Sequence, residues 1–192
     1  MTTIQKLFEI LLYFYCLGYV FVYIGFFLII QVTHLDFNLV STLAIILPFL
    51  ILLVFVSGFW NATYHDVKKE FWMKQRLLFI TILGSLPLII CSIFLAINEY
   101  QSIFQRERWV NNESDRVYMV DDLLSEVELT GKTREEVITL LGAPTETEYF
   151  QTDSNIVYYL GTERGIIPID SEWLVIDFDH NDVVKGYTVQ TD

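Results

Sequence analysis

The stretch GKTREEVITLLGAP, from Gly131 to Pro144, specifies a short helix together with both of its ends. Thr133 is suited to accept hydrogen bonds from the free N–H groups of the first turn. Glu136 is placed to reach back to the Thr133 backbone N–H, which completes a capping box. The apolar residues between the two ends give the helix one apolar face. Gly142 is expected to adopt the left-handed conformation that closes the helix, and Pro144 prevents the helix from continuing.

A second amphipathic helix is predicted before this stretch, and strands are predicted after it. From Asp115 onward, apolar residues recur at helical spacing as far as Val127. After Pro144 the period changes to two, which predicts strands over residues 146–151, 156–160, 172–178 and 183–190. Over residues 113–192 we therefore expect an α+β domain, with two helices packed on a sheet of three or four antiparallel strands.

The charged residues are distributed unevenly between the two halves of the chain. Residues 1–98 contain five Lys or Arg and four Asp or Glu, whereas residues 99–192 contain seven Lys or Arg and 20 Asp or Glu. An apolar half followed by an acidic half indicates a membrane part and a part exposed to water. The acidic half also argues against nucleic acid as a partner, because phosphate backbones are bound by Lys and Arg.

Three apolar runs in the first half are each long enough to cross a bilayer as a helix, which needs roughly 20 residues. These runs cover residues 7–30, 39–60 and 77–97. We expect a bundle of three transmembrane helices over residues 1–98, followed by a juxtamembrane helix or linker over residues 99–112. Pro48 and Pro87 are expected to kink the second and third helices. Gly18 and Gly25, on one face of the first helix, are expected to allow another helix to approach closely.

The loops between these runs predict the orientation of the chain. Residues 31–38 contain no Lys or Arg, whereas residues 61–76 contain Lys68, Lys69, Lys74 and Arg76. Short basic loops stay in the cytoplasm, so the N-terminus and the basic loop are expected inside the cell. The expected location is therefore the cell (inner) membrane, with the C-terminal domain extracytoplasmic, in the periplasm.

The acidic domain shows no set of residues that predicts catalysis. Around Asp177, Asp179 and His180, oxygens occur at alternate positions, but Asp182 and Thr188 stand where a calcium loop of the EF-hand type needs Gly and Glu. The serines of the domain lie in no nucleophile context. We therefore expect no enzymatic activity, no metal and no cofactor. The alternative from another class is a membrane-bound, metal-dependent hydrolase using Asp170, Glu172, Asp177, Asp179 and His180.

One loop of the acidic domain has an unusual composition. Residues 163–168 place Ile166 and Ile167 between a glycine and a proline, in a segment expected to face water. Exposed apolar loop residues are candidates for a contact surface, so Arg164, Ile166 and Ile167 are the predicted partner-binding residues. Two alternatives are that the isoleucines fold back over the sheet and that they rest on the bilayer.

The acidic domain resembles the SmpA/OmlA family, also called BamE-like, over about residues 115–190. The family motif is a G-x-T-x-x-x-V-x-x-x-L-G-x-P helix, followed by strands that end in a phrase like that of residues 174–179. The motif positions are occupied here by Gly131, Thr133, Val137, Leu141, Gly142 and Pro144. The resemblance implies a BamE-like fold, an envelope location and a tendency to bind protein without catalysis.

Members of that family are typically small envelope lipoproteins that act within outer-membrane assembly machinery. This chain differs, because Cys16 follows Tyr13, Phe14 and Tyr15 rather than small residues, and three predicted spans take the place of a lipid anchor. The resemblance then implies a membrane-anchored extracytoplasmic protein-binding module that scaffolds or regulates an envelope assembly. Its implied partners are the lipid bilayer and an envelope protein of unspecified identity. An envelope sensor that relays ligand binding through residues 98–110 is the alternative.

Overall fold

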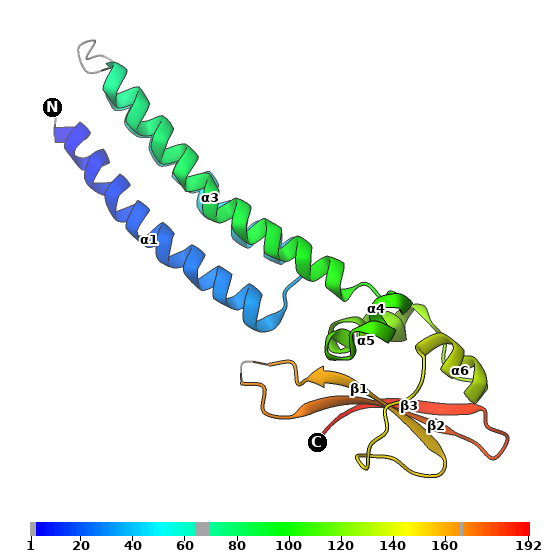
Figure 1. Ribbon diagram of the computed structural model, residues 1–192. Helices are drawn as coiled ribbons and strands as arrows, with labels where there is room; N and C mark the ends of the chain where they lie inside the picture. The colour runs from blue at the N-terminus through cyan, green and yellow to red at the C-terminus, as the bar shows by residue number, and fades with distance from the viewer. Residues whose placement is uncertain (1–2, 64–69, 166) are drawn as a thin grey trace. The chain divides into compact units, whose positions relative to one another are not determined.

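The computed structural model describes residues 3–63, 70–165 and 167–192 (Figure 1). The chain divides into two compact units, residues 1–97 and residues 98–192. We call them the membrane unit and the C-terminal unit. Each has its own hydrophobic core, so each is described by itself.

The membrane unit is built from three long helices, α1 (Thr3–Thr33), α2 (Leu39–Thr63) and α3 (Glu70–Ser102). Each helix contains a stretch long and apolar enough to cross a membrane, so the three long apolar helices predicted for this half of the chain are confirmed. The helices extend beyond the predicted spans because hydropathy marks only the lipid-facing part of a helix. Polar helix formers such as Lys74 and Gln75 continue α3 at its N-terminal end.

Three tyrosines of α1, spaced one turn apart, connect this helix to the other two. The donor–acceptor pairs are the Tyr15 hydroxyl with the Pro48 carbonyl at 2.6 Å, Tyr19 with Gly84 at 2.5 Å, and Tyr23 with Ile45. Gly84 and Ile45 lie three residues before Pro87 and Pro48, where a proline ring disturbs the helical hydrogen bonds and leaves carbonyls accessible. Hydroxyl groups of α1 therefore satisfy backbone acceptors at both proline sites, where a bilayer would supply no water.

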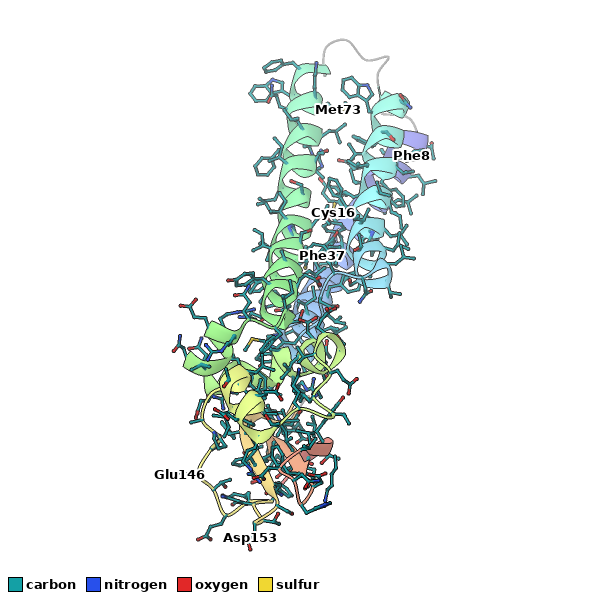
Figure 2. All side chains as sticks on the ribbon, turned by 90° about the vertical axis from the view of Figure 1, so that its right-hand side faces the viewer. Phe8, Cys16, Phe37, Met73, Glu146 and Asp153 are labelled. Atoms are coloured by element: carbon teal, nitrogen blue, oxygen red, sulfur yellow. The ribbon has the colours of Figure 1, made fainter. Side chains whose placement is uncertain are left out.

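Among the glycines of these helices, Gly84 is the one with the tightest neighbour, and the two glycines of α1 have none. A Cβ at Gly84 would lie 2.5 Å from Cδ2 of Leu52, whereas Gly18 and Gly25 have no neighbouring atom within 4 Å of an added Cβ. The expectation for Gly18 and Gly25 was wrong, because the tyrosine side of α1 faces the other helices. Figure 2 shows Phe8 and Met73 near one end of this bundle and Phe37 near the other.

The C-terminal unit contains a three-stranded antiparallel sheet with helices on one face (Figure 1). Its helical elements are α4 (Arg106–Asn111), the 3-10 turn η1 (Glu113–Asp115), α5 (Arg116–Glu126) and α6 (Arg134–Leu141). The strands are β1 (Asn155–Thr162), β2 (Ser171–Phe178) and β3 (Val184–Thr191), in the spatial order β1-β2-β3. The predicted α+β class, with helices on an antiparallel sheet, is confirmed.

Residues 146–151, predicted as a strand, form an irregular segment instead. The Tyr149 N–H donates to the Thr147 hydroxyl at 3.0 Å, and the Thr147 N–H donates to the Gln151 side chain at 3.4 Å. Phe150 has a φ of 56°, which lies outside the strand region. Hydrogen bonds from side chains to the nearby backbone compete with the backbone hydrogen bonds of a sheet, and in this segment the side-chain bonds are the ones formed.

The segment predicted as a linker contributes to the core of the C-terminal unit. α3 ends at Ser102, and α4 follows as a separate helix. Trp109 of α4 is fully buried, and its ring packs near the rings of Phe104 and Tyr158. Arg116 also belongs to this group, since its Nε donates to the Trp109 carbonyl at 2.7 Å. Residues 106–111 are therefore part of the folded unit rather than a connection leading to it.

Both faces of the sheet are covered at β1 and β2. The helix-facing core takes alternate strand residues: Ile156, Tyr158, Leu160, Leu174, Ile176 and Phe178. A second cluster on the opposite face joins Val157, Trp173 and Val175, with Phe150 and Tyr159 packed against it. The ring of Tyr149 stacks on Trp173, with centroids 5.5 Å apart. This double coverage explains why β2 is buried at nearly every position.

We predict that Gly142→Val destabilises the C-terminal unit. Gly142 ends α6 with φ 82° and ψ −171°, and a Cβ there would meet Cγ2 of Val110 at 3.2 Å. A β-branched residue at this positive φ should lower the free energy of unfolding by about 1–3 kcal/mol, measured by thermal melting of residues 98–192. Gly186→Val is the control, since an added Cβ at Gly186 meets nothing within 4 Å. Equal melting temperatures for the two variants would contradict the prediction.

Candidate functional site

The loop between β1 and β2, residues 163–170, has a closed base. The Glu163 N–H donates to the Asp170 carbonyl at 2.8 Å, directly beyond the last strand pair, Thr162 with Ser171. The loop therefore leaves and re-enters the sheet at one point. We call residues 163–170 the β1–β2 loop.

Arg164 clamps the base of the β1–β2 loop to the body of the unit. Its Nε and Nη2 donate to the two carboxylate oxygens of Glu172 at 3.1 and 3.0 Å, and its backbone N–H donates to Glu172 at 2.9 Å. Nη1 donates to Asp121 of α5 at 2.5 Å. Burial acts to lower the pKa of Arg164, but its bonds to Glu172 and Asp121 outweigh burial, and the pKa is raised. The guanidinium, on a side chain that is 36% exposed, is thus charged and bonded to carboxylates of β2 and α5, which joins the loop to both elements.

The apex of the β1–β2 loop presents apolar side chains to solvent. Ile167 is 74% exposed and Ile169 is 81% exposed. Among the described residues of the C-terminal unit, the next most exposed large apolar side chains are Tyr100, at 57%, and Tyr149, at 54%. Ile167 does not fold back over the sheet, and Ile166, the other predicted contact residue, lies outside the described residues. Sequence reasoning passed over Ile169, although it shares the same proline-containing segment.

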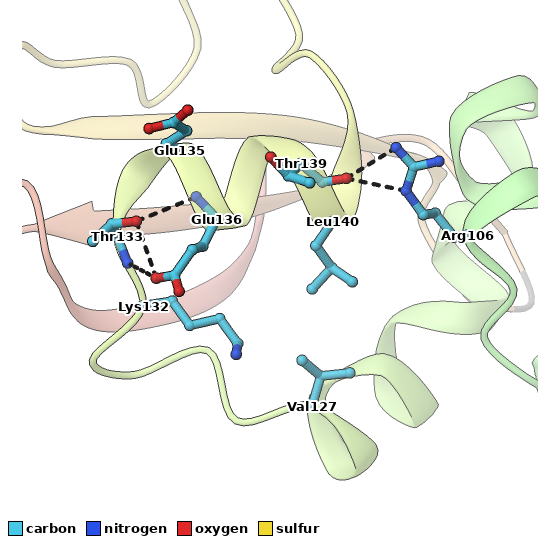
Figure 3. A pocket seen from close by; sticks show the side chains of 8 residues that line it. All are labelled: Arg106, Val127, Lys132, Thr133, Glu135, Glu136, Thr139 and Leu140. Atoms are coloured by element: carbon cyan, nitrogen blue, oxygen red, sulfur yellow. Dashed lines mark hydrogen bonds between the residues drawn. The ribbon is translucent and has the colours of Figure 1, made fainter.

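A groove runs beside the motif helix α6 (Figure 3). It has a volume of about 630 Å³, and its lining residues are Arg106, Val127, Lys132, Thr133, Glu135, Glu136, Thr139 and Leu140. The polar groups at its two ends are engaged with the helix. Nε and Nη2 of Arg106 both donate to the Thr139 carbonyl, at 3.1 and 2.9 Å, and Glu136 takes part in the cap.

The motif residues cap α6 and attach it to β3. The Thr133 N–H donates to the Glu136 carboxylate at 2.7 Å, and the Glu136 N–H donates to the Thr133 hydroxyl at 3.3 Å. The bond from the Thr133 backbone, together with that from its hydroxyl, lowers the pKa of Glu136. Gly131, with φ 85°, donates its N–H to the Val184 carbonyl at 3.0 Å. These contacts lie within the fold, and Pro144 follows two residues after Gly142, the C-cap of the helix.

The acidic cluster near the end of β2 forms a turn. The Asp179 carboxylate accepts the N–H groups of Asn181 and Val183 at 2.8 and 3.0 Å, and these backbone donors lower its pKa. Asp182 has a φ of 59° and pairs with Arg134 at 3.0 Å. Within the described parts of the chain, no three His, Cys, Asp or Glu side chains gather where they would hold a metal ion.

The fold and the site together define a small two-layer α+β domain with a capped motif helix and an exposed apolar loop. Residues 117–188, from α5 to β3, match the family model described as outer membrane protein assembly factor BamE domain. The C-terminal unit is therefore a BamE-like domain, and the chain joins it to three helices with the length and composition of membrane spans. No curated protein and no solved structure matches the chain.

We predict that Arg164→Met destabilises the C-terminal unit, because the carboxylate of Glu172, only 5% exposed, loses its positively charged partner and keeps only the backbone N–H of residue 164 as a donor. The expected loss in unfolding free energy is about 2 kcal/mol, measured by chemical denaturation of residues 98–192. Glu172→Gln added to Arg164→Met should recover part of that loss, since no buried charge then remains.

Asp121→Asn is the matched control for the Arg164 clamp. The Asp121 side chain is 72% exposed, so its removal should cost below about 1 kcal/mol. If Arg164→Met proved no more harmful than Asp121→Asn, the clamp would not hold the loop, and Arg164 would be free to act in partner binding.

Proposed function

We propose that this protein is a membrane-anchored protein-binding module of the cell envelope. In this proposal the three helices hold the BamE-like domain at the extracytoplasmic side of the cytoplasmic membrane. The domain contacts an envelope protein through the β1–β2 loop and so scaffolds or regulates an envelope assembly.

The observation that carries the proposal is the solvent exposure of the Ile167 and Ile169 side chains, at 74% and 81%.

The construction of the loop supports a binding role. Arg164 and the Glu163–Asp170 hydrogen bond hold the base of the loop, so the exposed side chains project from an anchored frame. A loop held in this way loses less conformational freedom on binding than a free loop, which favours affinity. Large apolar side chains kept in water at an anchored position are typical of contact surfaces.

The family match supports the compartment and the type of function. Its description refers to outer membrane protein assembly, a process that operates through contacts between proteins in the envelope. No three metal-ligating side chains gather among the described residues, and two acids of the alternative hydrolase site, Glu172 and Asp179, bond other parts of the fold. Glu172 belongs to the Arg164 clamp, and Asp179 stabilises the β2–β3 turn. A binding role therefore accounts for the site better than catalysis does.

We predict that Ile167→Asp/Ile169→Asp removes the contact between the domain and its partner. A photo-reactive amino acid at position 170, the residue that follows Ile169 at the base of the loop, should form a reproducible cross-link to an envelope protein in whole cells. The double substitution should lower the yield of that cross-link by at least about tenfold, as expected when contact residues of an interface are removed.

The control for the loop variant is Ile138→Asp on α6, where the side chain is 36% exposed. Thermal melting should show that both variants remain folded. A cross-linked protein that persists in the double variant would contradict the proposal. Cross-links to lipid alone would show instead that the loop rests on the bilayer.

A further inference from the structure

The membrane unit contains an apolar groove between α2 and α3. It has a volume of about 570 Å³, and its lining residues are Leu53, Val56, Ser57, Trp60, Lys74, Leu77, Leu78 and Thr81. From Lys74 to Thr81 the groove follows α3 for roughly 10 Å, at 1.5 Å per residue. The two hydroxyl groups are satisfied within their own helices, Ser57 by Val54 and Thr81 by Leu77, at 3.0 Å in both cases. Most of the groove thus offers only apolar contacts.

One end of the groove carries a positive charge. Lys74 makes no ion pair and no hydrogen bond with any residue in the described part of the chain. Arg76, two residues along α3, is used differently, because it pairs with Glu9 of α1 at 3.2 Å and donates to the Tyr13 hydroxyl. The Lys74 ammonium therefore remains available to an anion at the groove end, beside the indole of Trp60.

We infer that this groove binds one anionic phospholipid. An acyl chain lies against Leu53, Val56 and Leu77, and the headgroup phosphate pairs with Lys74. Trp60 marks the interfacial depth, where indole rings are favoured. A long basic side chain near the end of a membrane helix reaches toward headgroups in this way.

Charge and composition favour a lipid over a partner helix in this groove. Helix–helix contacts in membranes use small residues that allow backbones to approach, whereas this groove is lined mainly by branched apolar side chains, with Trp60 at the lysine end. An apolar partner helix would also leave the Lys74 ammonium without a counter-charge. An anionic phospholipid matches both the apolar floor and the cation.

The test uses the full chain in vesicles of phosphatidylcholine that contain brominated phosphatidylglycerol or brominated phosphatidylcholine. Bromine on the acyl chains quenches a nearby indole. Trp72, whose side chain is 78% exposed, is replaced by Phe, and the difference from Trp60→Phe/Trp72→Phe isolates the Trp60 signal. We expect Trp60 to favour phosphatidylglycerol over phosphatidylcholine by about fivefold, as one basic residue near anionic lipid provides.

Lys74→Gln should reduce this preference to about one, whereas Lys6→Gln, which removes one exposed lysine of α1 outside the groove, should leave it unchanged. Ser57→Leu, which fills the groove, should reduce the quenching of Trp60 by both lipids, with helical circular dichroism confirming that the bundle is intact. A preference that survives Lys74→Gln would overturn the inference. Equal quenching of Trp60 by the two lipids in the protein that keeps Lys74 would also overturn it. If neither lipid quenched Trp60, the groove would be closed or occupied by protein, and the inference would be wrong.

Discussion

The attachment of the motif helix to the last strand is the constraint on which the C-terminal unit depends. Two backbone hydrogen bonds join the residues before α6 to the start of β3. The Gly131 N–H donates to the Val184 carbonyl, and the Val184 N–H donates to the Lys132 carbonyl. The Arg134 N–H donates to the Asp182 carbonyl at 3.0 Å. These bonds join segments about 50 residues apart in sequence, at the N-terminal end of α6. The capping box begins α6 at Arg134, and the helix then buries Val137 and Leu141 in the core of the unit.

The loop proposed to bind a partner is a different segment of the chain from the motif that identifies the fold. The motif residues serve α6, while the exposed isoleucines lie in the connection between β1 and β2. The loop is instead held by Arg164, which contacts both β2 and α5. In the proposed function, the residues that identify the family and the residues that bind a partner are therefore different.

The elements that could be predicted from sequence are those whose signals are local. Thr133, Glu136 and Gly142 cap a helix through contacts with residues one or two turns away. The length of the three apolar runs is enough to predict three helices. The irregular segment near Tyr149 could not be predicted, because its apolar residues cover the outer face of the sheet at Trp173 rather than pairing as a strand. The pairing of Arg164 with Glu172 likewise arises from the closure of the loop, which brings together residues eight positions apart.

The membrane unit shows the same difference between local and non-local signals. Pro48 and Pro87 were visible as helix disturbances, but the tyrosines that satisfy the carbonyls near them come from another helix. The close approach at Gly84 depends on Leu52 of α2 and not on any pattern within α3. The groove with Lys74 at its end is likewise a consequence of how α2 and α3 are arranged along their length.

The central claim is that the BamE-like domain is displayed outside the cytoplasm by a three-helix anchor. The most direct measurement is the activity of alkaline phosphatase fused after Asp192, compared with a reporter that is active only in the cytoplasm. The proposed topology predicts an active phosphatase and an inactive cytoplasmic reporter, because three membrane spans with the basic 61–76 loop in the cytoplasm would put the C-terminus on the opposite side of the membrane. An inactive phosphatase with an active cytoplasmic reporter would contradict it.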